Sequence, residues 1–164
     1  LLKSTPNKVI GFGGIDYWKD GRETYDNIHL TYSYPNGVRA SFTCLTSNGK
    51  DDYQIKVMGD KATIIVGYQD AWIYPEGKYD KVIDDIDGVS GATASWTDGK
   101  GNSIKFDHKE PTHQALEDFK SAIINNTIPM SNIRSGADVA FSVDMGIRAM
   151  DTEKVIIWDP KYNL

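Results

Sequence analysis

The part of the sequence richest in chemically useful side chains is the stretch DYWKDGRETYD at residues 16–26. It combines flat aromatic side chains with cationic donors and several carboxylates. Such a mixture suits a ligand with hydroxyl groups on a carbon skeleton, because aromatic faces cover C–H groups while charged groups bond the hydroxyls. The candidate substrate-binding residues in this stretch are Tyr17, Trp18, Lys19, Arg22, Glu23 and Asp26.

The same stretch also has a simpler interpretation. Asp20 and Gly21 are a typical turn pair, so residues 16–26 are equally compatible with an ordinary polar loop between two strands. Residue types alone leave both the binding loop and the ordinary loop open.

A second candidate lies just before it, in the segment GFGGID at residues 11–16. Closely spaced glycines can hold a dinucleotide, but that site needs a strand, the pattern G-x-G-x-x-G, a helix and an acidic residue about 20 positions further on. Here the spacing is G-x-G-G, followed by a polar loop and another strand. We therefore expect a strand that passes close to its neighbours rather than a phosphate-binding loop.

Other motifs of catalysis or metal binding are missing from the sequence. It contains no Walker loop, HExxH, G-x-S-x-G or CxxC pattern. His29, His108 and His113 are scattered without metal-ligand spacing. The acidic segment 84–88 resembles part of a calcium loop but is better interpreted as a solvated turn. We expect no catalytic, cofactor-binding or metal-binding residue in this chain.

Length and composition favour one soluble domain over residues 1–164, with 40% hydrophobic residues and a net charge of −5. This mild acidity gives no electrostatic reason to bind nucleic acid or an anionic membrane. No window approaches the roughly 18 apolar residues of a membrane span. The sequence leaves the compartment open between cytoplasm and periplasm. Because the chain begins at Leu1 and its first residues resemble a helix end, we expect a longer parent protein.

An antiparallel hairpin must position the polar stretch. Residues 27–34 and 38–45 both alternate apolar and polar side chains, and Pro35–Gly37 form the turn between them. The polar face of this hairpin carries His29, Thr31, Arg39, Ser41 and Thr43.

The remaining periodicity changes from strands to helices along the chain. Strands are predicted at 8–15, 53–59, 61–67, 71–75 and 154–158, a weaker outer hairpin at 82–96 and 103–109, and helices at 111–126 and 135–150. Pro111 suits a first helical turn and Thr112 is a candidate cap. The second helix is apolar nearly all round, so we expect it to be covered on more than one side.

These elements predict an α+β fold. A mainly antiparallel sheet is backed on one face by two helices near the C-terminus. Its other face is open for association with a partner subunit.

The segment GFGGIDYWKDGRETYDNIHLTYSYPNGVRASF at residues 11–42 resembles the segment that follows the nucleotide domain in Gfo/Idh/MocA oxidoreductases. These enzymes are related to glucose–fructose oxidoreductase and inositol dehydrogenase. The segment HQALEDFKSAIINNTIPMSNIRSGADVAFSVDMGIRAM at residues 113–150 is similar to the closing helix pair of that family. The likeness is co-linear over most of the chain and weakest at 68–106.

The resemblance implies that this chain is the family's C-terminal domain, which closes one side of the active site and often forms the subunit interface. NAD or NADP would then be bound mostly by an N-terminal nucleotide-binding domain that this chain lacks. The family's glycine fingerprint, its E-K-P lysine and its catalytic aspartate/histidine pair have no match here. We therefore expect this chain alone to be inactive and to bind no cofactor.

Together, the residues and the resemblance predict the substrate-side and oligomerisation domain of an NAD(P)-dependent oxidoreductase for a sugar- or cyclitol-like compound. In this hypothesis Trp18 stacks on the substrate, and Lys19 and Arg22 donate to its hydroxyls or to a carboxylate. Asp26 orders the loop. The alternative is a non-catalytic carbohydrate-binding or assembly domain, and an upstream strand–GxGxxG–helix followed by E-K-P would favour the enzyme.

Overall fold

The computed structural model describes residues 4–50, 53–76, 101–105 and 110–163. Its contacts divide the chain into two compact units, Leu1–Gly49 with Thr112–Leu164, and Lys50–Pro111. That residues 1–164 form a single domain stays a prediction.

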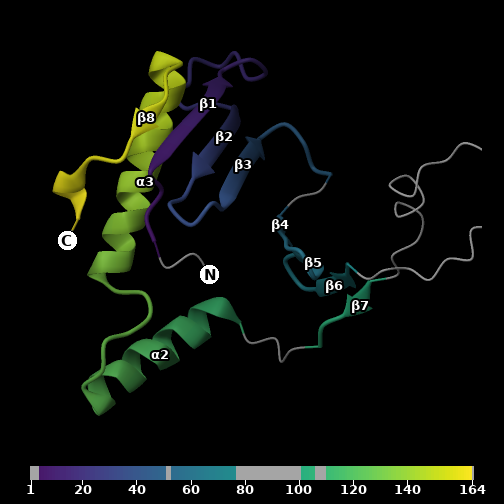
Figure 1. Ribbon diagram of the computed structural model, residues 1–164, viewed down its shortest axis with the longest axis vertical. Coiled ribbons are helices and arrows are strands. Elements are labelled where there is room, and N and C mark those ends of the chain that lie inside the picture. The colour runs from purple at the N-terminus through teal and green to yellow at the C-terminus, as the bar shows by residue number, and fades with distance from the viewer. Residues whose placement is uncertain (1–3, 51–52, 77–100, 106–109, 164) are drawn as a thin grey trace, which may run out of the picture. The chain divides into compact units, whose positions relative to one another are not determined.

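The first unit contains a four-stranded antiparallel sheet in the order β3-β2-β1-β8 (Figure 1). Its strands are β1 (Lys8–Gly14), β2 (Asn27–Ser33), β3 (Arg39–Leu45) and β8 (Ile156–Ile157). The predicted hairpin is confirmed, with Leu30 opposite Phe42. Its turn includes Gly37 at φ +86°, a conformation that glycine adopts without steric cost.

The alternation seen in the sequence assigns the two faces of this sheet. Val9, Leu30 and the half-buried Tyr32 lie on one face and contribute to the core. On the other face His29 and Thr31 are exposed. A one-residue shift in register would exchange the two sets, so the apolar pattern specifies the pairing.

Helix α3 (Ile133–Thr152) packs on the apolar face of the sheet, against β1 and β8 (Figure 1). It begins two residues earlier than predicted, because the side chain of Asn132 caps it by accepting from the backbone N–H groups of Arg134 and Ser135. Met145 and Ala149 are fully buried against Val9 and Leu30. This cluster is the core of the first unit.

The glycines of GFGGID serve this packing. A Cβ on Gly11 would lie 2.1 Å from the carbonyl oxygen of His29, and one on Gly13 would lie 2.6 Å from the sulfur of Met150. Both positions are inside β1, so the prediction of a strand passing close to its neighbours is confirmed. Alanine at Gly11 would meet backbone, which cannot rotate away.

The second unit contains another antiparallel sheet, in the order β4-β5-β6-β7. Its strands are β4 (Ile55–Met58), β5 (Ala62–Val66), β6 (Ala71–Pro75) and β7 (Asn102–Ser103). The predicted strands at 53–59, 61–67 and 71–75 are confirmed. Most of the predicted outer hairpin, including the acidic segment 84–88, lies outside the described residues.

Helix α2 (Pro111–Asn125) differs from its prediction in two respects. Thr112 lies inside the helix rather than before it, because the helix begins at Pro111 and proline's fixed φ fits the first helical position. The apolar side chains Leu116, Phe119 and Ala122 have helical spacing, but only Ala122 is buried, while Leu116 and Phe119 are exposed.

These elements confirm the predicted α+β class, with antiparallel sheets followed by two helices near the C-terminus. The strands fall into two sheets within the described residues. No described helix has the length and apolar character needed to cross a membrane.

Candidate functional site

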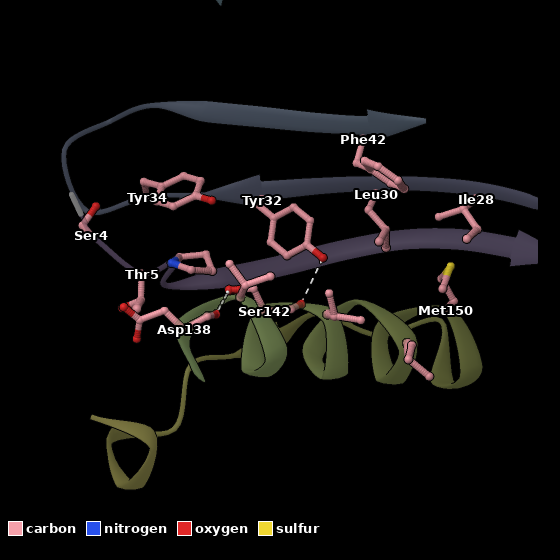
Figure 2. A pocket seen from close by; sticks show the side chains of 14 residues that line it. Ser4, Thr5, Ile28, Leu30, Tyr32, Tyr34, Phe42, Asp138, Ser142 and Met150 are labelled. Atoms are coloured by element: carbon pink, nitrogen blue, oxygen red, sulfur yellow. Dashed lines mark hydrogen bonds between the residues drawn. The ribbon is translucent and has the colours of Figure 1, made fainter. Parts of the chain in front are cut away.

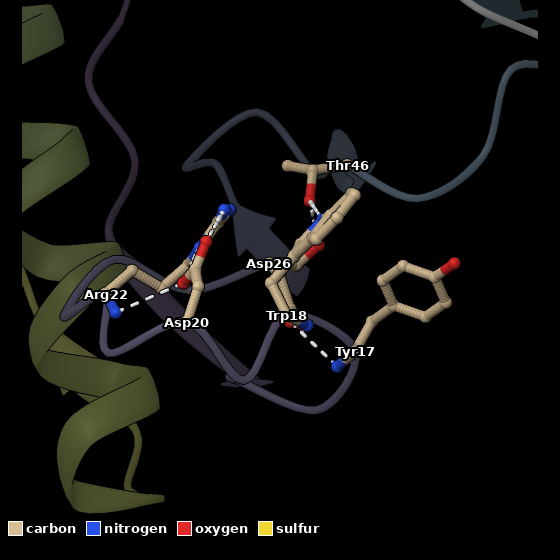
Figure 3. A network of polar contacts seen from close by, with 6 residues as sticks. All are labelled: Tyr17, Trp18, Asp20, Arg22, Asp26 and Thr46. Atoms are coloured by element: carbon tan, nitrogen blue, oxygen red, sulfur yellow. Dashed lines mark hydrogen bonds and ion pairs between the residues drawn. The ribbon is translucent and has the colours of Figure 1, made fainter.

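The connection between β1 and β2 is organised around the carboxylate of Asp26, which is only 3% exposed. It accepts hydrogen bonds from the backbone N–H groups of Tyr17 and Trp18, each at 2.8 Å (Figure 3). The backbone N–H of Asp16 donates to the same carboxylate at 3.0 Å. The side-chain amide of Asn27 adds a fourth bond at 3.1 Å. One side chain therefore fixes the backbone of three consecutive loop residues.

These bonds determine the ionisation of the carboxyl group. Burial alone would raise the pKa of Asp26, but hydrogen bonds from the N–H groups of Trp18, Asp16 and Tyr17 favour the charged form and lower the pKa to about 2. Asp26 is therefore a carboxylate at neutral pH, and its charge is satisfied by the loop it holds.

The backbone of Asp26 joins the same point to both neighbouring strands. Its N–H donates to the carbonyl oxygen of Gly14 at 2.9 Å, and its carbonyl oxygen accepts from the backbone N–H of Thr46 at 3.0 Å. The end of β1, the start of β2 and the end of β3 thus meet at one residue. This makes the base of the loop continuous with the sheet.

Trp18 contacts this junction and remains 38% exposed. Its indole N–H donates to the hydroxyl of Thr46 at 3.1 Å. The guanidinium of Arg22 lies 5.2 Å from the centre of the ring, and Tyr17 meets it edge-on at 4.9 Å. The cation–π contact and the hydrogen bond fix the orientation of the indole.

The cationic side chains of the loop are also paired within it. Arg22 forms a two-point ion pair with Asp20, with Nε to Oδ1 at 2.8 Å and a terminal nitrogen to Oδ2 at 2.5 Å. This hydrogen bonding lowers the pKa of Asp20 to about 2. The Lys19 ammonium donates to the carbonyl oxygen of Ile15. A ligand using either cation would share it with these oxygens or displace them.

Tyr17 and Glu23 are the outward-facing members of the candidate set. Tyr17 is 64% exposed, and Figure 3 shows its ring projecting away from Asp26. Glu23 is exposed at the far side of the turn that contains Gly21. The accessible aromatic surface is therefore mainly that of Tyr17.

The far end of the connection is attached to α3. The Tyr25 hydroxyl donates to Asp151 at 2.7 Å, which raises the pKa of Tyr25. The hydrogen bond joins the loop to the last turn of the helix that covers the sheet.

The structure brings the sequence-predicted residues together in one loop, with Trp18, Arg22 and Asp26 in a connected network (Figure 3). Sequence reasoning did not identify Thr46, which bonds both Trp18 and the backbone of Asp26. In the register that the hairpin turn sets, Asn27 pairs with Leu45. Thr46, which follows Leu45, therefore lies beside Asp26. The predicted hairpin alone was therefore enough to place Thr46 beside Asp26.

A dinucleotide would need an open glycine-rich loop, and a metal ion would need a cluster of ligating side chains. The glycine segment is part of β1 and pairs with β2, so its backbone groups do not form the open loop at a helix N-terminus that holds a pyrophosphate. No group of three or more His, Cys, Asp or Glu side chains among the described residues could hold a metal ion.

The arrangement of strands and helices is shared with solved oxidoreductase structures. An aldose-aldose oxidoreductase from Caulobacter crescentus, complexed with glycerol, superposes with a TM-score of 0.71 and 15% identity over 94% of this chain. A putative oxidoreductase from Thermotoga maritima gives 0.66 and 12% over 94%, and an NAD-binding protein from Listeria innocua 0.66 and 16% over 96%. At these identities the likeness concerns the fold.

The chain spans less than half the length of these structures, 42%, 41% and 47% respectively. None of the curated protein sequences matches it.

Residues 2–157 match the family model of the oxidoreductase C-terminal α/β domain, named for Gfo/Idh/MocA. The chain therefore belongs to the Gfo/Idh/MocA C-terminal domain family, as the resemblance predicted.

Proposed function

We propose that this chain is the substrate-side and oligomerisation domain of an NAD(P)-dependent oxidoreductase that acts on a sugar- or cyclitol-like compound. The nicotinamide cofactor would be bound by a nucleotide-binding domain of the longer protein. The observation that carries the proposal is the loop organised by Asp26, which presents aromatic and charged groups in a fixed arrangement.

Two properties of this loop suit substrate recognition. Its backbone is held before any ligand arrives, so binding would not have to order it. Its exposed surface offers the Tyr17 ring for C–H groups, with Lys19 and Arg22 within the same loop as donors. The existing ion pair with Asp20 means that Arg22 would contact a substrate while remaining oriented by that carboxylate.

The names of the similar structures are in keeping with this substrate class and cofactor. One is an aldose-aldose oxidoreductase and another an NAD-binding protein. Membership of the oxidoreductase domain family supports the general reaction class.

The proposal is tested with the intact protein. Reduction of NAD+ or NADP+ is followed with a panel of aldoses, cyclitols and linear polyols, and residues 1–164 alone serve as the inactive control. Turnover of a polyhydroxylated substrate by the intact protein supports the proposal. Sugar binding without turnover of any panel member would instead favour a carbohydrate-binding module.

The oligomerisation part of the proposal concerns the sheet face turned away from α3. This face carries the predicted residues His29, Thr31, Arg39, Ser41 and Thr43, and also the apolar side chains Ile10 and Phe12. Phe12 lies opposite His29 and is 58% exposed. An aromatic side chain amid polar neighbours is typical of the centre of an association surface.

Light scattering on the intact protein tests this part independently. We expect a homo-oligomer, and Phe12→Arg should shift it toward the monomer because the charge would be placed inside the interface. Lys8→Arg, at an exposed position on the same strand and face, is the matched control. A strict monomer before any substitution contradicts the proposed interface.

A further inference from the structure

The dipeptide Asn-Gly occurs twice in the sequence, at Asn36–Gly37 and at Asn48–Gly49. Asparagine before glycine is prone to deamidation, because glycine has no Cβ to hinder attack of its backbone nitrogen on the preceding side-chain carbonyl. All four residues are exposed, so solvent reaches both pairs. Sequence and exposure therefore do not distinguish the two pairs, but their hydrogen bonds do.

The first pair is held in the hairpin turn between β2 and β3. The N–H of Gly37 donates to the carbonyl oxygen of Tyr34 at 3.1 Å, and the N–H of Tyr34 donates to the carbonyl oxygen of Val38 at 3.0 Å. The side-chain oxygen of Asn36 accepts from the N–H of Val38 at 3.2 Å. The Gly37 nitrogen can attack this side chain only after the turn opens.

The second pair follows β3, and its glycine is the last residue of the first unit. The N–H of Asn48 donates to the carbonyl oxygen of Leu45 at 3.4 Å, whereas no described residue accepts from the N–H of Gly49. A Cβ on Gly49 would meet no atom within 4 Å, so the space beside the attacking nitrogen is open. The Gly49 nitrogen can therefore approach the Asn48 side chain without breaking a hydrogen bond of its own.

Ser47 contributes a second favourable feature at this pair. Its hydroxyl donates to the side-chain carbonyl oxygen of Asn48 at 3.2 Å. A donor at this oxygen stabilises the negative charge that the oxygen acquires when the carbonyl carbon is attacked. Asn36 also has a donor at this oxygen, but its attacking nitrogen is held in the turn. Only the second pair combines a polarised carbonyl with an available nitrogen.

We propose that Asn48 is a site of spontaneous deamidation, at which the backbone nitrogen of Gly49 closes a ring onto the side chain. The nitrogen loses its proton to hydroxide and forms a bond to Cγ of Asn48, and the side-chain amino group leaves as ammonia. Water then opens the cyclic imide at one of its two carbonyl carbons. One opening gives aspartate and the other gives isoaspartate, and neither consumes an oxidant or a reductant.

This modification changes both the charge and the path of the chain. It adds one carboxylate to a chain whose net charge is −5. The isoaspartyl product also lengthens the main chain by one methylene, two residues after Thr46, which bonds Trp18 and the backbone of Asp26 (Figure 3). The proposal concerns the chemistry of this segment and is independent of the substrate of the longer protein.

The first experiment incubates the intact protein in mildly alkaline buffer and follows both pairs by peptide mass spectrometry. Electron-transfer fragmentation distinguishes aspartate from isoaspartate. We expect product at Asn48 to form at least about fivefold faster than at Asn36, whose turn must first lose a hydrogen bond. Equal rates at the two pairs, no product at residue 48, or aspartate without isoaspartate would each overturn the proposal.

The second experiment repeats the incubation with two variants. Gly49→Ala should fold normally, because Gly49 has no positive φ and its Cβ would meet no atom. It should lose most of the product at residue 48, because the added methyl group hinders ring closure. Ser47→Ala should slow the reaction at Asn48 about fivefold and leave Asn36 unchanged.

Each variant tests one named group. An unchanged rate in Gly49→Ala would overturn ring closure through the Gly49 nitrogen. An unchanged rate in Ser47→Ala would overturn the role proposed for the hydroxyl. The unmodified rate at Asn36, measured in the same samples, is the internal control for both variants.

Discussion

The β1–β2 loop and the apolar groove that Phe42, Val143 and Ile147 line between the sheet and α3 (Figure 2) are opposite cases of surface structure in the first unit. In the loop, the polar groups that could bind a ligand already bond one another, with Asp26 accepting from Asp16, Tyr17 and Trp18. In the groove, apolar side chains such as Val143 remain exposed. The loop contains its own partners, and the groove does not.

This difference separates two sources of order. The polar loop is stabilised mainly by hydrogen bonds between its own residues, such as those that Asp26 accepts. Most of its conformation is therefore specified by residues close together in the sequence. An apolar surface gains stability only when another surface covers it. Changes in the loop should therefore act in the same way in any longer protein, whereas changes in the groove should depend on what covers it.

The largest effect is expected from Asp26→Asn in the intact protein. An amide replaces one of the acceptor oxygens with a donor, so the N–H groups of Tyr17 and Trp18 lose their charged acceptor. Displacement of the loop by about 1 Å should lower kcat/KM roughly 100-fold if the loop contacts substrate. Steady-state kinetics measure this, with Asp144→Asn as the exposed control.

The same variant also changes the pH dependence of stability. The folded-state pKa of Asp26 is about 2, below the ordinary value of 3.8 for an aspartate side chain. The carboxylate therefore contributes stability that is fully present above pH 4 and is lost as the pH falls toward 2. Denaturant titrations should show a shallower acid dependence for Asp26→Asn, and an unchanged dependence would contradict the role assigned to its charge.

The groove provides the next largest effect, through Ile147→Ala in the intact protein. Ile147 is 47% exposed among the described residues, so where another part of the intact protein covers the groove, removing this side chain should lower the free energy of unfolding by about 2 kcal/mol. Ile128→Ala, at an exposed position between α2 and α3, should change it by less than about 0.5 kcal/mol. Chemical denaturation measures the free energy of unfolding of both variants. Equal losses for Ile147→Ala and Ile128→Ala would show that the groove position is no more covered than the exposed one.

Within the loop, Tyr17→Ala and Trp18→Ala separate contact from architecture. We expect each to lower kcat/KM about tenfold, a change of about 1.4 kcal/mol. Only Trp18→Ala should also lower the melting temperature, because it removes the bond to Thr46 and the contact with Arg22. Unchanged kcat/KM for Trp18→Ala and Arg22→Ala with the true substrate would contradict the binding hypothesis.

The smallest effect is expected from Gly21→Ala. Gly21 has φ +87° and no atoms near its missing Cβ, so the cost is backbone strain alone, about 1 kcal/mol. Gly37→Ala, at φ +86° in the hairpin turn, is a matched comparison without a place in the loop. We expect both variants to lose a similar free energy of unfolding, and only Gly21→Ala to lower kcat/KM. That result would support a functional role for the loop.

Local patterns account for what the sequence predicted well. Strict alternation in residues 27–34 and 38–45 specified the hairpin and its faces, because only one register buries Leu30 and exposes His29. The G-x-G-G spacing at residues 11–14, followed by a polar loop and a strand rather than a helix, argued against a dinucleotide loop, and the structure places Gly11 and Gly13 inside β1. The i,i+4 spacing of Asp144 and Arg148 on α3 likewise indicates an ion pair, and their charged atoms lie 3.7 Å apart.

Non-local contacts account for what the sequence could not supply. The candidate residues 17–26 were chosen by composition, which does not show that Trp18 bonds Thr46 or that Arg22 pairs with Asp20. Burial was also hard to predict, since apolar character alone does not state which neighbour covers a side chain. Leu116 of α2 and Val143 of α3 both belong to apolar stripes and both are exposed.

The hydrogen bond from the Tyr25 hydroxyl to Asp151 makes the last turn of α3 a shared support. On one flank of that helix lies the groove, which reaches Met150, and at its end the polar loop is attached. The bond therefore gives the loop a second anchorage, besides the one at Asp26, on the same element that lines the groove.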